Sequence, residues 1–327
     1  MMKHTLARSL DWLDDRLAAA TLAKRRERPA LLGFLFHSVF ESAAEIAADR
    51  VWPAQPLQTT ELGHFLEHFM AHGYRFVTPA EILEGLDADG YYALLTFDDG
   101  YANNRRVLPI LRALSVPATF FISARHVAEG NAFWWDVVYR ERRRRGISFA
   151  AIRREVRALK RRTPEAVDAY LRQHFGAAAL RPVSDTDRPF TTEELRTFAA
   201  EPLVTLGNHT ARHAELTDQG ADRAAAEIRD CQTFLTRITG RPPEILAYPN
   251  GRYDAHSIAA ATAAGLRLGV TVGRRKNYLP LSGAAAMQID RAFVPCGGAL
   301  MRACVRSRSD VQVRRWLASA RPGRGAQ

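Results

Sequence analysis

Residues 94–104 read LLTFDDGYANN, and this stretch is the point from which both the fold and the chemistry can be argued. The apolar run YALLTF (92–97) has the length and composition of a buried strand. It leads directly into two adjacent carboxylates, Asp98 and Asp99, and then a glycine. Neighbouring carboxylates repel each other, and burying either one without a partner is costly. The sequence therefore predicts a positively charged group beside this pair.

Similar apolar runs recur along the chain and alternate with helical segments. They are ALLGFLFHSVF (30–40), YRFVT (74–78), VPATFFIS (116–123), LVTLG (203–207), EILAY (244–248), RLGVTV (267–272) and MQIDRAFV (287–294). This alternation favours a parallel α/β architecture, and seven or eight strands at this length predict a barrel. In such barrels the chemistry gathers at the C-terminal ends of the strands. His37, Asp98, Asp99, His209 and Tyr248 all fall at such ends.

One stretch, residues 137–190, breaks this rhythm because helix formers and arginine dominate it. We expect a helical insertion there, within a domain that spans residues 29–300. A helical segment (1–28) precedes this domain, and a C-terminal helix and tail (301–327) follow it. The insertion is either a solvated pair of basic helices or a surface for an anionic carrier or a membrane.

The overall charge narrows the classes of partner. The formal net charge is +11, and nearly all of the positive charge is arginine, since lysine occurs only at positions 3, 24, 160 and 276. No nucleic-acid-binding motif accompanies these arginines, so we expect no nucleic-acid partner. The N-terminus lacks the uninterrupted apolar core of a signal peptide, and no window of about 18 apolar residues predicts a membrane span. The expected location is the cytoplasm.

Two histidines four residues apart, His209 and His213 in HTARH, follow the strand LVTLG. Together with a carboxylate they would form a two-histidine, one-carboxylate site with open positions, which suits zinc, although other first-row metals also accept it. One aspartate of the pair can bind the cation while the other stays nearby as a base. A second histidine series, at positions 64, 68 and 72, has no carboxylate at a strand end, so we do not expect it to bind a metal. The apolar face beside it, with Leu62, Phe65, Phe69 and Met70, indicates core packing.

Three short motifs follow one another along the chain: TFDDG (96–100), HTARH (209–213) and AYPNG (247–251). They resemble the first three motifs of the polysaccharide deacetylases, also called the NodB-homology fold or carbohydrate esterase family 4. The resemblance covers roughly residues 30–295. It implies a deformed (β/α)7-type barrel, NodB-like, with a helical insertion. It also implies metal-dependent removal of acetyl groups from N-acetylated amino sugars, with Zn2+ as the expected divalent metal.

The resemblance also assigns roles to residues of this chain. It implies that Asp98 is the catalytic base and that Asp99, His209 and His213 are the metal ligands. A metal-held water would lose a proton to Asp98 and attack the acetamide carbonyl. The metal and a backbone N–H of the third motif would stabilise the oxyanion. In that motif, Tyr248 and Asn250 are expected to shape the acyl pocket and bind substrate.

Two departures from the family pattern matter. Much of the family has an arginine two residues before the proline of the third motif, but this chain has Ala247 there. We expect Arg291 to substitute as the partner of the base; the alternative is a surface arginine. The late histidine that serves as general acid is also absent. A branch of the family that acts on poly-N-acetylglucosamine takes this role from an early strand, so we expect His37 to be the acid, or else a structural histidine.

The aromatic run FWWD (133–136) offers a surface for a sugar ring, because aromatic faces stack on sugars. We take Trp135 as a candidate substrate contact, with core packing as the alternative. The leading interpretation is thus a hydrolase, an N-deacetylase in polysaccharide or glycolipid biosynthesis. Its substrate would be an N-acetylated glycan or a carrier-linked amino sugar. The alternative is a non-catalytic glycan-binding relative, against which the four retained base and metal-ligand residues argue.

Overall fold

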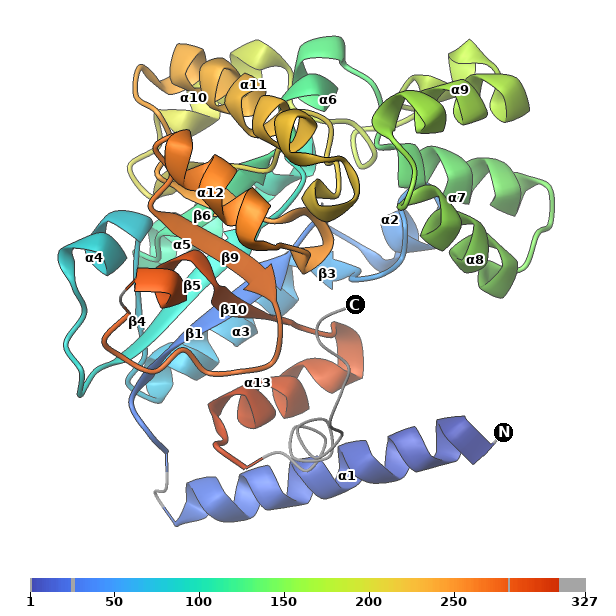
Figure 1. The fold of residues 1–327 in the computed structure, drawn as a ribbon. Helices are drawn as coiled ribbons and strands as arrows, with labels where there is room; N and C mark the ends of the chain where they lie inside the picture. The colour runs from blue at the N-terminus through green and yellow to red at the C-terminus, as the bar shows by residue number, and fades with distance from the viewer. Residues whose placement is uncertain (1, 25–26, 282, 312–327) are drawn as a thin grey trace.

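Seven parallel strands close into a barrel in the computed structural model, which describes residues 2–24, 27–281 and 283–311 (Figure 1). The ring runs in the order β1, β10, β9, β8, β7, β6 and β5, and β5 pairs back with β1. These strands are β1 (Ala30–Phe36), β5 (Tyr91–Phe97), β6 (Ala118–Ile122), β7 (Val204–Asn208), β8 (Ile245–Ala247), β9 (Leu268–Val272) and β10 (Ile289–Phe293). The predicted seven-stranded (β/α) barrel is confirmed.

The ring is deformed along one edge of β5. β6 pairs with β5 only at Thr96 and Phe97. The short strand β4 (Arg75–Phe76) pairs with the N-terminal half of β5. Outside the ring, β2 (Val39–Phe40) and β3 (Leu57–Gln58) pair only with each other. The barrel is therefore splayed at its N-terminal end, whereas its C-terminal end, where β5 meets both neighbours, is closed.

The register between β1 and β5 is the feature that positions the site. The two strands pair over their full length, so Phe36 lies opposite Phe97. His37 and Asp98 follow this last pair, and Asp98 N donates a 2.8 Å hydrogen bond to Phe36 O. Because the strands are parallel, the next residues of both leave the barrel at the same level.

Alternate side chains of the strands enter two separate cores. On β5, Leu94 packs with Leu31, Phe121 and Ile289, which come from strands on several sides of the ring and so fill its interior. Its neighbour Leu95 belongs to a larger cluster with the surrounding helices. This alternation has the two-residue period of a strand covered on both faces.

Helices cover the outside of the ring (Figure 1). They are α3 (Thr59–Ala71), α4 (Pro79–Glu84), α5 (Leu108–Leu114), α6 (Ala124–Glu129), α10 (Thr192–Ala199), α11 (Ala221–Thr239) and α12 (Ala255–Ala263). α1 (Met2–Ala23) and α13 (Leu300–Arg308) pack against each other beside the barrel, and Arg306 binds Asp15 across them. The short helix α2 (Ala43–Ala47) follows β2.

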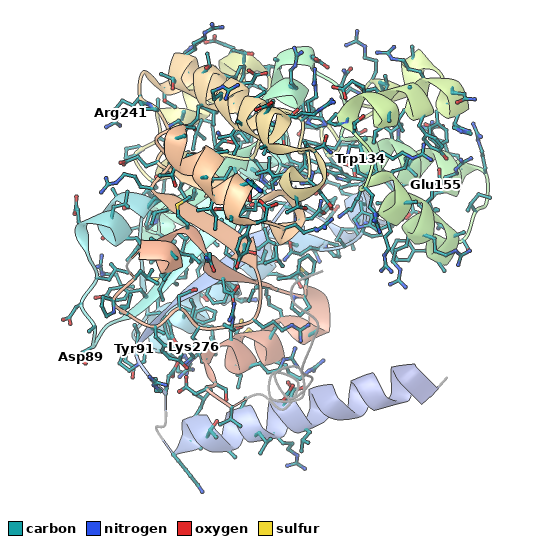
Figure 2. All side chains as sticks on the ribbon, viewed as in Figure 1. Asp89, Tyr91, Trp134, Glu155, Arg241 and Lys276 are labelled. Carbon is teal, nitrogen blue, oxygen red and sulfur yellow. The ribbon has the colours of Figure 1, made fainter. Side chains whose placement is uncertain are left out.

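The insertion stands apart on the right of Figure 1, between β6 and β7. Its helices are α7 (Trp134–Arg144), α8 (Phe149–Leu159) and α9 (Pro164–Phe175). They share a core of their own that includes Val138, Ile152 and Leu171. Figure 2 shows Trp134 and Glu155 on these helices. Glu155 accepts hydrogen bonds from Arg142, so part of the arginine charge is neutralised within the insertion.

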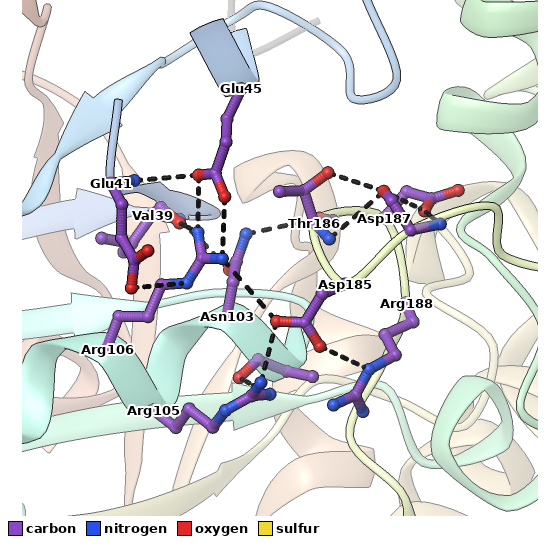
Figure 3. A network of polar contacts seen from close by, with 12 residues as sticks. Val39, Glu41, Glu45, Asn103, Arg105, Arg106, Asp185, Thr186, Asp187 and Arg188 are labelled. Carbon is purple, nitrogen blue, oxygen red and sulfur yellow. Dashed lines mark hydrogen bonds and ion pairs between the residues drawn. The ribbon is translucent and has the colours of Figure 1, made fainter. Parts of the chain in front are cut away.

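A polar network ties the insertion to the barrel, as Figure 3 shows. Arg106 forms a two-pronged pair with Glu45, at 2.8 and 3.0 Å, and also donates to the carbonyl of Val39. Asp185, near the end of the insertion, accepts a 2.8 Å hydrogen bond from Arg105. Asn103 lies between these segments and accepts from Val39 N. The network thus clamps together three segments that surround the C-terminal end of the barrel.

Within the described ranges, no helix combines the length and apolar character needed to cross a membrane. The predicted domain boundaries after residues 28 and 300 stay predictions. Residues 312–327 of the predicted C-terminal tail lie outside the described part of the chain.

Candidate active site

The carboxylate pair Asp98 and Asp99 lies at the end of β5, where both side chains are buried. Asp98 is 4% exposed and Asp99 2% exposed. The backbone turns sharply here, with φ of 77° at Asp99 and 90° at Gly100. Aspartate tolerates this left-handed region better than most residues, and glycine tolerates it freely. The turn keeps the two carboxylates next to each other at the end of β5 while giving them different partners.

Arg291 is the partner of Asp98. Its Nη1 and Nη2 donate to the two carboxylate oxygens of Asp98 at 2.7 and 2.9 Å, and Arg291 is fully buried. Nη1 also donates to Thr96 Oγ1, and Nε donates to Thr271 O. This bidentate geometry fixes the orientation of Asp98. In much of the family an arginine at the position of Ala247 is the partner of the base. In this chain Arg291, on β10, makes that contact.

Asp99 meets the two histidines of the HTARH loop. Asp99 Oδ1 lies 3.4 Å from His209 Nε2 and 3.5 Å from His213 Nε2. The loop holds this arrangement through a left-handed backbone at Thr210 and His213, with φ of 62° and 55°. Asn208 Oδ1 accepts from Thr210 N at 2.8 Å and so secures the start of the loop.

These three side chains fit a divalent cation. One ligand atom from each lies within 4.8 Å of the others, and within the described ranges no other histidine, cysteine or acidic side chains form such a group. Asp99 Oδ1 is buried and forms no hydrogen bond to a described residue. Tetrahedral zinc bonds of 2.0–2.1 Å imply ligand atoms separated by about 3.4 Å. The distances from Asp99 Oδ1 to the two imidazoles match that value.

The protonation states also suit a cation. His209 Nδ1 lies 2.8 Å from the carbonyl oxygen of Ala247, which can only accept, so Nδ1 is a donor and Nε2 is the nitrogen left for a cation. Burial lowers the pKa of His209, but Asp98 and Asp99 outweigh it and raise that pKa, so a cation bound at Nε2 would take the place of a proton there. Burial and the neighbouring His209 hold the pKa of His213 well below its usual range. Burial raises the pKa of Asp99, but His209 and His213 outweigh it and hold that pKa well below its usual range.

His37 faces the same cavity and has an unpredicted partner, Gln55. The Gln55 amide donates from Nε2 to the carbonyls of Leu35 and Val294, both at 2.7 Å. This leaves Gln55 Oε1 to face His37 Nδ1 at 3.0 Å. Since Oε1 can only accept, His37 Nδ1 is the donor, and Nε2 is the nitrogen left for substrate.

A cavity of about 270 Å³ lies against part of this site. Its lining includes His37, Asp99, His213, Asn250 and Trp135, and among the remaining lining residues are Trp52, Gln55, Tyr101, Lys160, Val272 and Phe293. Tyr248, in contrast, is fully buried in a core cluster with Leu246, Ala261 and Met287. Its side chain packs between β8 and α12, so the structure places Asn250 at the cavity and Tyr248 behind it.

Trp135 is buried as well as cavity-lining. Its indole Nε1 donates to Tyr101 Oη at 2.9 Å, and Tyr101 Oη donates to Asp136 at 2.7 Å. Its ring lies 4.7 Å from that of His213. Trp135 therefore joins the insertion to the turn that follows Asp99, and one side of it faces the cavity.

The histidine series on α3 has no metal-binding geometry. His68 and His72 stack with ring centres 4.5 Å apart, and His72 Nδ1 lies 2.6 Å from the carbonyl oxygen of His68. Sequence reasoning missed Gln55 and Lys160 as residues of the site. Gln55 gives no local pattern in the sequence, whereas Lys160 stands out as a rare lysine in an arginine-rich segment.

Comparisons with known proteins identify the family of this chain. The family model for polysaccharide deacetylase matches residues 86–269, more than half of the chain. YxkH of Bacillus subtilis is 20% identical over 252 residues, which is 76% of this chain and 66% of YxkH.

Solved structures show the same fold. The deacetylase PplD of Streptococcus pyogenes, in complex with acetate, is 16% identical with a TM-score of 0.58, and the match covers 86% of this chain and 99% of that one. IcaB of Ammonifex degensii is 17% identical with a TM-score of 0.56, again over 86% and 99% of the two chains. This chain belongs to the polysaccharide deacetylase family, whose members are hydrolases that act on carbon–nitrogen bonds other than peptide bonds.

Proposed function

We propose that this protein is a metal-dependent N-deacetylase that removes acetyl groups from N-acetylated amino sugars in polysaccharide or glycolipid biosynthesis. One observation carries the proposal: the Asp98–Arg291 pair and the Asp99–His209–His213 group lie together at the end of β5. The family acts on N-acetylated polysaccharides and is generally metal-dependent. A polymeric glycan and a carrier-linked amino sugar are both candidate substrates.

Asp99, His209 and His213 would hold the cation, with zinc as the proposed metal. When bound, it would supply a Lewis acid that polarises the acetamide carbonyl and lowers the pKa of a water molecule. Asp98, oriented by Arg291, would accept a proton from the attacking water.

The leaving group then needs a proton, because an amine departs poorly as an anion. Water oxygen bonds to the acetamide carbon, and the electrons of the C–N bond go to nitrogen as that bond breaks. His37 Nε2 would donate the proton to this nitrogen, while Gln55 holds the ring through Nδ1. The products are acetate and the free amino sugar. A backbone N–H near Asn250 would stabilise the developing oxyanion.

The contact of the insertion with an anionic carrier or membrane surface stays a proposal. Several arginines of the insertion already have acidic partners: Arg140 binds Asp187, Arg142 binds Glu155 and Arg143 binds Asp49.

The test is acetate release from oligomers of N-acetylglucosamine, linked β-1,4 or β-1,6, and from lipid-linked N-acetylated sugars. Asp98→Asn should lower the rate by about 10²-fold or more, since a general base contributes that much, and it should keep its metal. His209→Ala should lose most of the metal, which elemental analysis measures. A wild-type protein that binds these glycans but releases no acetate would instead support the non-catalytic alternative.

A further inference from the structure

Lys160 belongs to the insertion, and its side chain lines the cavity at the end of the barrel. It follows α8 directly, and its N–H donates to Val156 O at 3.0 Å, which fixes it to the end of that helix. Together with His213 and Asn250 it lines the cavity of about 270 Å³ and also the adjacent smaller one. Among the lysines whose side chains the structure describes, it is the one that reaches this site.

The Lys160 ammonium binds the third-motif loop. Nζ donates to Asn250 Oδ1. Asn250 has a left-handed backbone, with φ of 57°, which turns it toward the cavity. Because Asn250 Oδ1 faces the ammonium, its Nδ2 points elsewhere. The two side chains therefore present N–H donors on a wall that faces the acidic end of β5.

The Lys160 ammonium has more N–H donors than it has hydrogen-bond acceptors among the described residues. An ammonium has three N–H donors, and in the described part of the chain Asn250 Oδ1 is the one hydrogen-bond acceptor for Lys160. The nearest acids, Asp99 and Glu215, act on it only through their charges, and Glu215 is bound by Arg252. A group that brings oxygen acceptors into the cavity would satisfy the remaining donors.

Resting on the proposed function, we propose that Lys160 is a substrate-binding residue that the insertion contributes to the deacetylase site. Its ammonium donates to an uncharged oxygen, a hydroxyl or glycosidic oxygen, of the sugar that carries the acetamide. A neutral acceptor fits better than a phosphate or carboxylate, because the nearby cations Arg125 and Arg212 already bind Glu129 and Glu165. Lys160 takes no part in proton transfer.

The experiment compares Lys160→Met, Lys160→Gln and Lys160→Arg with Arg154→Met, which removes an exposed cation from the same helix. The substrate is the N-acetylglucosamine tetramer, β-1,4- or β-1,6-linked, that wild type deacetylates. Steady-state acetate release gives kcat and KM. Calorimetry gives the Kd of the same tetramer for Asp98→Asn with and without Lys160→Met, so that binding is measured without turnover.

Lys160→Met and Lys160→Gln should raise KM and Kd about tenfold or more, the scale of a hydrogen bond to a charged group. The kcat should change little, because a contact made equally in the ground and transition states affects KM. Lys160→Arg should recover part of the affinity, and Arg154→Met should match wild type. Metal content should not fall, since removal of a nearby positive charge does not disfavour a cation.

The contrary outcomes are distinct. If wild type is active and both Lys160→Met and Lys160→Gln keep its Kd, the inference is wrong while the proposed function stands. A fall in kcat or metal content at unchanged Kd would assign Lys160 a structural role instead, which also overturns it. If Lys160→Met fails to fold, Lys160→Gln decides. No acetate release by wild type from any substrate would remove the proposed function and this inference together.

Discussion

At the scale of single residues, the Arg291–Asp98 pair is an ion pair buried at the end of the barrel. Both side chains are buried, and the guanidinium also satisfies Thr96 and Thr271. A buried pair is weak evidence for stability as a whole, but removal of one partner leaves a buried charge without compensation. The pair therefore fixes the orientation of Asp98. It also means that loss of either side chain would lower the stability of the fold.

We predict that Arg291→Met lowers the free energy of unfolding by about 3–5 kcal/mol, the usual effect of stranding a buried charge. Urea unfolding of the purified protein measures this. The double variant with Asp98→Asn should recover part of the loss, because the stranded carboxylate becomes neutral. Arg274→Met, which removes an exposed cation, is the control. A loss in Arg291→Met no larger than in that control would contradict the prediction.

At the scale of elements, α3 carries a histidine whose titration should weaken the fold in acid. Burial lowers the pKa of His68 to about 4, and the nearby His72 and Arg308 lower it further, while Glu27 acts in the opposite sense. Its Nε2 is buried without a hydrogen bond to the described residues. A histidine with a depressed folded pKa contributes its full stability above the unfolded value of 6.5, and this is lost as the pH falls toward 4.

His68→Gln should therefore show a smaller drop in the free energy of unfolding between pH 7 and pH 4.5 than wild type. Urea unfolding at several pH values in this range provides the measurement. His64→Gln, an exposed histidine on the same helix, should follow wild type. Equal drops for wild type and His68→Gln would rule out this source of acid sensitivity.

The clamp between β2, the turn after β5 and the end of the insertion is the second feature at this scale (Figure 3). Arg106 has a side chain only 11% exposed and contacts Glu45, Glu41 and Asp185. We predict that Arg106→Met costs about 1–2 kcal/mol of stability, more than a surface pair, because its hydrogen bonds are charge-assisted and partly buried.

Thermal or urea unfolding would check this, with Arg196→Met as the matched control. Arg196 pairs with Glu193 on an exposed helix face, where side chains are 51% and 79% exposed. Such pairs contribute about 0–1 kcal/mol. If the two variants lose the same stability, the clamp contributes no more than an ordinary surface pair.

At the scale of the whole molecule, the proposed cation should stabilise the fold. A ligand that binds only the native state adds about 4 kcal/mol at a thousandfold excess over its Kd. We predict that Zn2+ raises the Tm of wild type by several degrees and that a chelator reverses this. His213→Ala should lose the shift, whereas His64→Gln should keep it. A shift of the same size in His213→Ala would place the binding elsewhere.

Much of this architecture could be predicted from the sequence, because it depends on local patterns. The apolar run before Asp98 and the spacing of His209 and His213 are local, and each led to the correct end of a strand. The contact between Arg291 and Asp98 was expected only because Ala247 stands where much of the family has an arginine, so that another arginine had to take its place.

The rest depends on tertiary packing that no local pattern encodes. Gln55 reaches His37 from the segment before β3, and Lys160 reaches Asn250 from the insertion. Tyr248 shows the opposite limit. It lies in a family motif, yet its side chain points into the core behind the loop, because it continues the alternation of β8 and so shares the face of Leu246 and not that of Ala247.

Because β10 closes the ring, the site can assemble only after β10 has been synthesised. β10 supplies Arg291 and is the last strand of the barrel to be synthesised, whereas its neighbour β1 is the first. A growing chain that ends before residue 289 leaves one edge of β1 open and Asp98 without its guanidinium. Barrel closure and the pairing of Asp98 with Arg291 therefore arrive together, late in synthesis, and a partly made chain has the carboxylate pair without its guanidinium.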